Sequence, residues 1–449
     1  MTSRVFDSDS TALLAVYGIY SQVVLPNGFS GGIYSVDVLT GLSGDELQQS
    51  PGELNTTYAA FYANAVPSTI TFLSGTTTYF WSELYNKIYA CNSALEGINA
   101  STGMTAPAKQ QLTGEVKFLR AFFYFYLVNL YGDLPLALST DYKVNNALSR
   151  TPVMGIYAQM IADLTAAENG LGNDYTFGIC ISTTSRQTAD KQVAAALLAR
   201  VYLYTMNFQQ AEQQATSVIT DPAYRLEPDL NKVFLQASHE AIWQLQWQGS
   251  ASFTLDASAY VLTPGQAPLV FMPGSMSAFL VNSFEAGDRR RADWVGTDSV
   301  AAGGTTPAAV YYYPYKYRVR NPDSAGIELV AALRLGEQYL IRAESRAQQG
   351  NLTGAAADLN SIRNRAGLPN TTATTRSGLL AAIYHERQVE LFTEWGHRWF
   401  DLKRTGNIDS VMSIVCPAKG TVWNSYAQLY PIPINDIQLD PNLKQNEGY

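Results

Sequence analysis

The chain has 449 residues, 47% of them hydrophobic, and its 30 Lys and Arg against 38 Asp and Glu give a formal charge of −8. This composition excludes a disordered chain, and the acidic balance argues against nucleic acid as a partner, because that ligand needs a positive surface. Three cysteines without a Cys-x-x-Cys pair, together with only three histidines, predict no metal site and no cofactor.

Helical hairpins follow one another along the chain, beginning with residues 9–24 paired with 79–98 and continuing with 115–133 paired with 153–171. Two later hairpins repeat each other at an offset of 144 residues, and each turns at an asparagine, Asn207 or Asn351. Such a hairpin buries its apolar stripe only against the next one, as in tetratricopeptide-like repeats. The sequence therefore predicts an all-α fold of four hairpins in a right-handed superhelix.

A stretch of different character interrupts the repeats. Trp243, Leu245 and Trp247 alternate with glutamines, which predicts a half-buried strand, and scattered Gly, Pro and aromatic residues follow. We expect one unit, residues 1–449, with a helical scaffold at about 9–221 and 331–410, an irregular loop-rich insert at about 222–330 and an extended C-terminal segment at about 411–449.

Several motifs are spread along most of the chain. In chain order they are KFLRAFFY at 117–124, YGDLPL at 131–136, LIRAE at 340–344, LNSIRNRAGL at 359–368, ERQVEL at 386–391, GHRWFDLKR at 396–404, YPIP at 430–433 and NLKQNEGY at 442–449. Together these motifs resemble those of the SusD/RagB family of nutrient-binding outer-membrane lipoproteins.

The resemblance implies a non-catalytic, cell-surface protein that binds an oligosaccharide and delivers it to a SusC-like TonB-dependent outer-membrane barrel. It also implies a lipid anchor in the outer membrane, so we expect the native precursor to carry an export signal that ends in a lipidated Cys upstream of Thr2. Two alternatives stay open: a cytosolic tetratricopeptide adaptor that binds a peptide, and an all-helical glycosidase. Peptide cargo within the family is a further possibility.

Charged residues in the motifs have a structural interpretation. We expect ion pairs between helices, formed by Arg120, Arg342, Arg363 and Arg365 with Glu115, Glu344 and Asp358. Glu386, Glu390 and Glu394 share one helical face and Asp401 follows, a pattern that glycoside hydrolysis could use. Basic neighbours, Arg387, Arg398, Lys403 and Arg404, favour ion pairs that keep these carboxylates charged, whereas a general acid needs a raised pKa. We therefore predict no catalytic residue.

Carbohydrate binding suits the aromatic content, 28 Tyr, 18 Phe and 7 Trp, because flat rings cover the apolar face of a sugar while polar groups bond its hydroxyls. We expect the ligand on the loop face rather than in the repeat groove, because the aromatic residues of the helices are used in internal packing and those of the loops are not. For Trp81 and Trp294, packing in the core is the alternative to ligand binding. The tyrosines near residue 312 lie in a predicted strand, where alternate residues face the core and the solvent. The platform candidates are Tyr79, Phe80, Trp81, Trp294, Tyr311 and Tyr313, and the polar candidates are Asp45 and Asn55.

Overall fold

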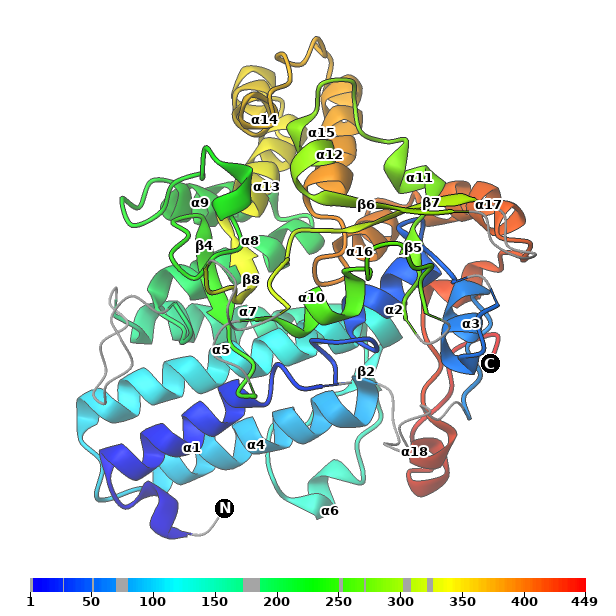
Figure 1. Cartoon of the computed structure of the whole chain (residues 1–449). Helices are drawn as coiled ribbons and strands as arrows, with labels where there is room; N and C mark the ends of the chain where they lie inside the picture. The colour runs from blue at the N-terminus through cyan, green and yellow to red at the C-terminus, as the bar shows by residue number, and fades with distance from the viewer. Residues whose placement is uncertain are drawn as a thin grey trace.

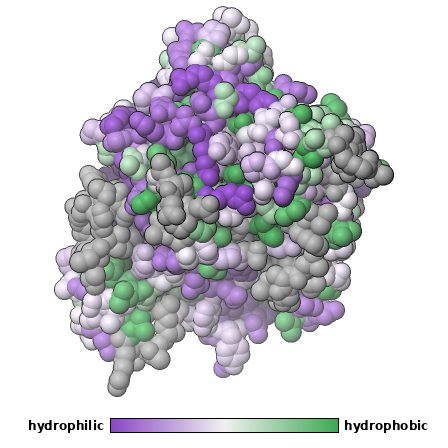
Figure 2. Space-filling view, viewed as in Figure 1, coloured by the Kyte–Doolittle hydropathy of each residue, from purple (hydrophilic) through white to green (hydrophobic). Residues whose placement is uncertain are grey.

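The structure is a computed structural model that describes residues 3–26, 28–50, 52–69, 80–172, 186–249, 253–269, 272–301, 308–320 and 326–449. Helices dominate these residues (Figure 1), and none of the described helices is both long and apolar enough to cross a bilayer. Figure 2 shows hydrophilic residues gathered over the upper part of the molecule, where α12, α14 and α15 lie, with hydrophobic residues in separate small patches elsewhere on that face.

The repeat scaffold is a continuous stack of helices. Its members are α1 (Asp9–Ser21), α4 (Phe80–Ala100), α5 (Ala106–Tyr131), α7 (Val153–Gly170), α8 (Lys191–Tyr204), α9 (Phe208–Ile219), α13 (Leu335–Gln348), α14 (Leu352–Arg365) and α15 (Arg376–Glu390). Each helix from α4 to α9 packs on the next, and α13 then packs on α9, α14 and α15. The all-α tetratricopeptide-like prediction is confirmed, and the hairpins on either side of the insert are direct neighbours in space.

Local chemistry explains why the repeated hairpins turn where they do. The Asn207 and Asn351 side chains cap α9 and α14, accepting hydrogen bonds from the backbone N–H groups of Gln210 and Gly354. The residue before each asparagine, Met206 or Gly350, has a positive φ of 56° or 86°. The left-handed turn thus recurs at the same repeat position, although only one copy uses the glycine that favours it.

Residues 222–330 form more regular structure than the expected loops. The elements are η2 (Leu230–Lys232), β4 (Ala241–Leu245), α10 (Leu255–Tyr260), β5 (Ser275–Met276), α11 (Ala278–Val281), α12 (Arg289–Asp293), β6 (Val295–Val300) and β7 (Ala309–Pro314), after which β8 (Val330–Arg334) returns to the scaffold. The strands β4 and β8 pair antiparallel, and so do β6 and β7.

The half-buried strand predicted around Trp243 is wrong in one respect, because all five residues of β4 are buried. The Trp243 indole packs edge-on against Phe118 and Phe122 of α5, at 4.9 Å between ring centroids in each case. The intervening Gln244 is also buried, and its amide donates to the Leu235 carbonyl at 3.0 Å. Helices and insert cover both faces of this strand, so Gln244 occupies a core position in which its amide N–H is bonded and its side-chain oxygen has no partner among the described residues.

The remaining short elements cover the ends of the stack. They are η1 (Ser3–Phe6), α2 (Val36–Ser43), β1 (Leu47–Gln48), α3 (Thr56–Tyr62), β2 (Leu134–Pro135), α6 (Tyr142–Asn145), β3 (Arg150–Thr151), α16 (His397–Arg404), α17 (Ile408–Ala418), η3 (Ser425–Gln428) and α18 (Ile434–Leu439). The expected extended segment at 411–449 therefore begins only after α17. It is held at the C-terminal end of α5, where the Tyr430 N–H donates to the Leu130 carbonyl and the Asn446 amide donates to the Tyr131 carbonyl.

Candidate functional site

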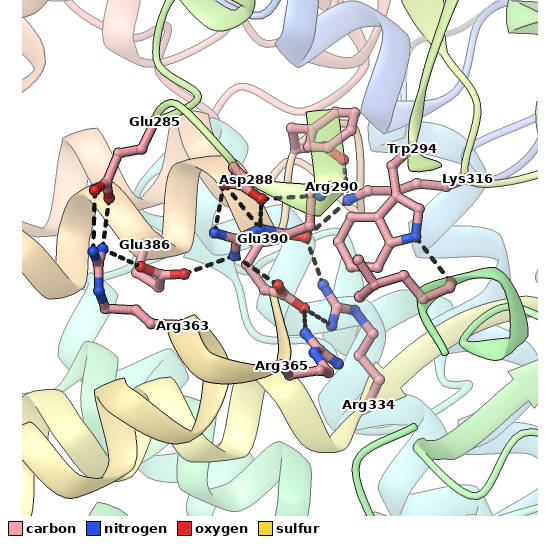
Figure 3. A network of polar contacts seen from close by, with 12 residues as sticks. Glu285, Asp288, Arg290, Trp294, Lys316, Arg334, Arg363, Arg365, Glu386 and Glu390 are labelled. Atoms are coloured by element: carbon pink, nitrogen blue, oxygen red, sulfur yellow. Dashed lines mark hydrogen bonds and ion pairs between the residues drawn. The ribbon is translucent and has the colours of Figure 1, made fainter. Parts of the chain in front are cut away.

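The carboxylates that a glycosidase could use lie inside an ion-pair network (Figure 3). Glu390 receives hydrogen bonds from Arg290 at 2.9 Å, from Arg334 at 2.6 Å and from Arg365. Its neighbour Glu386 pairs with Arg290 at 2.7 Å. Both glutamates have no exposed surface, so no substrate can reach them in this arrangement.

The electrostatics of Glu390 and Asp401 fit ion pairing, whereas burial raises the pKa of Glu386, a carboxyl with no exposed surface. The guanidinium groups around Glu390 outweigh its burial and hold the pKa of that carboxyl well below its usual range. Arg387 and Arg404 likewise lower the pKa of Asp401, which opposes the effect of its burial. Asp401 pairs with the predicted neighbours Arg387 and Arg404. Glu386 and Glu390 also form ion pairs, but with arginines that were not predicted as their partners: Arg290, Arg334, Arg363 and Arg365.

The partners of the other arginines were only partly predictable. Arg342 pairs with Asp358 at 2.7 Å, as expected, whereas Arg120 pairs with Asp163 and not with Glu115. Arg363 pairs with Glu285 and Glu386, and Arg365 pairs with Glu240 and Glu390. Glu344 pairs with Arg404. The paired residues are far apart in the sequence, so the prediction, which considered only nearby acids, missed them.

Half of the predicted platform aromatics, Phe80, Trp81 and Trp294, are buried in the core. Tyr79 lies outside the described residues. Phe80 is buried against Phe29, with ring centroids 5.5 Å apart. Trp294 has no exposed surface, donates its indole N–H to the Leu230 carbonyl at 3.0 Å and lies beneath the Lys316 ammonium. A glycan platform needs an open ring face, so the prediction is wrong for Phe80 and Trp294 in this structure.

The two polar candidates are also engaged within the protein. Asp45 is buried and accepts hydrogen bonds at 2.9 and 2.6 Å from Arg398. Asn55 is fully buried: its side-chain oxygen caps α3 through the Thr57 N–H, and its amide donates to the Tyr34 hydroxyl at 3.0 Å. Both side chains hold the N-terminal segment in place, so their expected part in ligand binding is not supported.

Tyr311 and Tyr313 remain half-buried, and they share a face of β7 because they are two residues apart. Tyr313 packs over Gly296 of β6 and against Tyr315, with ring centroids 5.7 Å apart. In Figure 1 the β6–β7 pair lies in the upper half of the molecule and α4, which carries Trp81, lies in the lower half. The structure therefore does not bring these candidates together.

Trp81 lines a cleft of about 500 Å³ beside α4. Its ring is 3% exposed and packs against Tyr85 and Tyr131, so only a small part of it reaches the cleft. Tyr89, one turn beyond Tyr85, is 53% exposed and offers an open ring. The α4 wall consists of Trp81, Tyr85, Asn86, Ile88, Tyr89 and Asn92.

The connection between α5 and α7 forms the second wall. Side chains of α4 hold it: the Tyr85 hydroxyl donates to the Pro135 carbonyl at 2.8 Å, and the Asn92 amide donates to the Ala137 carbonyl at 3.0 Å. Arg120 in turn fixes Asn92 by donating to its side-chain oxygen at 2.9 Å. The residues of this wall are Pro135, Ala137, Ser139, Asn145, Asn146 and Leu148.

The C-terminal segment closes the cleft. Its lining residues are Asp436, Leu439, Asp440 and Leu443, from α18 and the turn that follows. Figure 1 shows α6 beneath α4, and α18 to the right, near the end at which α4 begins. Burial raises the pKa of the Asp436 carboxyl. Burial also raises the pKa of the Tyr85 hydroxyl well above its usual value, so this hydroxyl stays protonated and able to donate at neutral pH.

The cleft combines three aromatic rings with amides, a hydroxyl and carboxylates, and its walls contain no Lys or Arg among the described lining residues. No group of three or more potential metal ligands occurs in the described part of the chain. Sequence reasoning missed Asn86 and Tyr89. The available signal was their place on α4, off the apolar stripe of Trp81, Leu84 and Ile88. Nothing local predicted that residues 135–148 and 436–443 would meet that helix.

Comparisons with known proteins agree over most of the chain. One matching family model is described as "SusD family" and covers residues 291–449, and another, "Starch-binding associating with outer membrane", covers residues 43–203. The chain is 27% identical over 377 residues to SusD-like protein P2 of Formosa agariphila, which covers 74% of this chain and 72% of that protein.

A second relative is the starch-binding protein SusD of Bacteroides thetaiotaomicron, 24% identical over 438 residues, with 78% of this chain and 75% of that protein covered. Among solved structures, a laminarin-binding SusD-like protein matches with a TM-score of 0.77 at 23% identity, covering 98% of this chain and 99% of the other. The two family models together match residues in both the N-terminal and the C-terminal parts of the chain, and the solved structures share its fold. The chain belongs to the SusD/RagB family.

Proposed function

We propose that this chain is a non-catalytic glycan-binding protein of the outer-membrane surface, which holds an oligosaccharide in the α4 cleft. The observation that supports this most is the cleft itself, where the exposed ring of Tyr89 lies among neutral hydrogen-bonding groups such as Asn86 and Ser139. The names of two similar proteins, starch-binding and laminarin-binding, point to the same class of ligand.

The chemistry of a sugar explains this choice of groups. The C–H face of a pyranose packs on an aromatic ring, and its hydroxyls both donate and accept, which amides and hydroxyls can match. Each ring contributes roughly 1 kcal/mol beyond its buried area, and each hydrogen bond about as much after exchange with water. We expect a dissociation constant between about 1 μM and 1 mM, weak enough for the ligand to be released to a transporter.

The proposed partner is a SusC-like TonB-dependent barrel, and the proposed anchor is a lipid on a Cys upstream of Thr2. The family model described as associating with the outer membrane supports the location. Co-expression of the full reading frame with a SusC-like barrel, followed by detergent extraction, tests both. Membrane fractionation with the barrel supports the proposal, and recovery of the protein alone in the soluble fraction contradicts it.

Affinity electrophoresis in gels that contain starch, laminarin or other neutral polysaccharides tests the binding itself. We expect at least one neutral glycan to retard the wild-type protein, and Tyr89→Ala to abolish the retardation while leaving the melting temperature unchanged. Tyr311→Ala is the matched control, because it removes a tyrosine from the alternative site on β7. Retardation that depends on Tyr311 and not on Tyr89 would place the site elsewhere.

Product analysis over time distinguishes a binding protein from a glycosidase. The bound oligosaccharide is incubated with the protein, and the mixture is separated by chromatography at intervals. We expect the oligosaccharide to remain intact, because Glu386 and Glu390 are enclosed by arginines. Steady release of shorter sugars would contradict the non-catalytic assignment.

A further inference from the structure

A second cavity of about 470 Å³ adjoins the α4 cleft. Tyr89 lines both cavities, and the opposite wall is also continuous, since Ser139 lines the first cavity and its neighbour Thr140 lines the second. The two cavities therefore meet between Tyr89 on one side and residues 139–140 on the other.

The helix itself makes the two cavities parts of one groove. Tyr85, Tyr89, Ser93, Glu96 and Ala100 succeed one another at intervals of four or three residues, which places them along one face of α4. At 1.5 Å per residue this face is about 22 Å long between Tyr85 and Ala100. A single sugar ring would cover only a small part of that length.

Hydrogen bonds hold the groove open without a ligand. The Glu96 carboxylate accepts from the Thr140 N–H at 2.8 Å and from the Thr140 hydroxyl, which fixes the far wall beside the second cavity. Asn145 donates to the Ser139 carbonyl at 2.9 Å and fixes the same wall beside the first. A groove preorganised in this way loses little conformational entropy when a ligand binds.

The charge of the groove is one-sided. The charged residues among its described lining are Asp436 and Asp440 in the first cavity and Asp7 and Glu96 in the second, with no Lys or Arg in either. An anionic glycan would place its carboxylates or sulfates beside these groups without a cation to pair them, which is unfavourable. A neutral glycan meets no such repulsion.

We propose that the groove along α4 binds a neutral oligosaccharide chain that crosses Tyr89 and occupies both cavities, so that chain length and absence of charge determine its selectivity. This inference rests on the proposed function, since it specifies the ligand of the same site. Tyr89 is the shared contact, with one sugar ring on its face and the rest of the chain extending into each cavity.

Titration calorimetry with maltooligosaccharides and laminarioligosaccharides, from disaccharide to octasaccharide, tests the length dependence. In the series that binds, we expect affinity to increase about tenfold from the shortest to the longest chain, which corresponds to about 1.4 kcal/mol, and then to level off. Oligogalacturonides of the same lengths serve as the anionic probe, and we expect them to bind at least about tenfold more weakly.

Ser93→Leu separates the two cavities, because it adds apolar bulk in the second cavity alone. We expect this variant to bind the disaccharide as the wild type does and to lose the gain in affinity for longer chains. The matched control is Ser413→Leu, at an exposed position of α17. An affinity that does not depend on length, an unaffected Ser93→Leu variant, or equal binding of oligogalacturonides would overturn the inference and leave the proposed function standing. If no neutral probe binds the wild type, the proposed function itself fails.

Discussion

Two polar regions of the molecule differ in how their hydrogen bonds are satisfied. Around Glu390, three arginines from separate segments surround a carboxylate that has no exposed surface, and every charge finds its partner within the chain. Along α4, amides and carboxylates border open cavities beside the exposed Tyr89 ring. The first region holds segments together, whereas the second has polar groups that border an open groove.

The comparison shows that a concentration of charge does not by itself mark a functional site. The motif residues of α15 and α16 are the most charged part of the chain that we considered for catalysis, and they form internal ion pairs. The α4 groove has fewer charged residues and is lined by amides, hydroxyls and a few acids. Access to solvent, and not the density of charged residues, distinguishes the α4 groove from the buried ion pairs.

The largest expected effect comes from breaking the buried network. Glu390→Ala removes the carboxylate that Arg290, Arg334 and Arg365 share, and removing one partner of a buried ion pair costs about 3–5 kcal/mol of unfolding free energy. Denaturant unfolding monitored by circular dichroism checks this. Glu447→Ala, at an exposed position, is the control and should change the stability little. A Glu390→Ala variant as stable as the wild type would contradict the structural role of the network.

A second change tests whether Trp294 belongs to the interior. Trp294→Phe removes the indole N–H that bonds the Leu230 carbonyl and leaves a small cavity, so we expect a loss of about 2 kcal/mol in stability. The glycan affinity of the folded variant should equal that of the wild type. Reduced affinity without a change in melting temperature would return Trp294 to the ligand site.

A smaller effect depends on pH. Burial, with the Asp45 charge nearby, raises the pKa of Glu46 to about 8. Because the folded pKa lies above the unfolded one, Glu46 contributes most stability at low pH and loses it as the pH rises toward 8. Glu46→Gln keeps a neutral side chain at every pH, so we expect it to be more stable than the wild type near pH 8 and nearly equal to it near pH 5.

Urea unfolding at both pH values measures this difference. Glu447→Gln, at an exposed position, provides the control and should show the same stability as the wild type at each pH. If the Glu46→Gln difference stayed constant from pH 5 to pH 8, the raised pKa of Glu46 would be refuted.

The smallest expected effect concerns one exposed amide of the α4 cleft. Asn146→Ala removes a side chain that lines the cavity, which should weaken glycan binding by about 1 kcal/mol, or roughly fivefold, and leave the stability unchanged. Titration calorimetry measures the loss. Asn370→Ala, an exposed asparagine far along the chain, is the matched control, and an equal loss of affinity in both variants would mean that Asn146 makes no specific contact.

The sequence predicted the helical stack because its determinants are local or repeated. The capping asparagines Asn207 and Asn351 and the apolar stripes of the helices are visible without tertiary information. The buried β4 was harder, since Gln244 satisfies its amide through the Leu235 carbonyl, a contact that no periodicity reveals. Ion-pair partners such as Arg120 and Asp163 depend likewise on which helices become neighbours.

The candidate site was predicted less well for a related reason. Loop location was taken as evidence of exposure, yet Trp294 follows a short helix and still points into a second core, and Asn55 is a helix cap. Tyr89 was overlooked because it lies in a helix. Its exposure results from residues 135–148 and 436–443 flanking that face of α4 without covering the ring, an arrangement that only the folded chain shows.

The most direct test of the central claim is a crystal structure of the protein with the longest neutral oligosaccharide that binds. We predict ordered sugar rings between α4 and residues 135–148, with one ring face on Tyr89 and the chain extending toward Ser93. Sugar bound on the β6–β7 pair, with the α4 groove empty, would contradict the account.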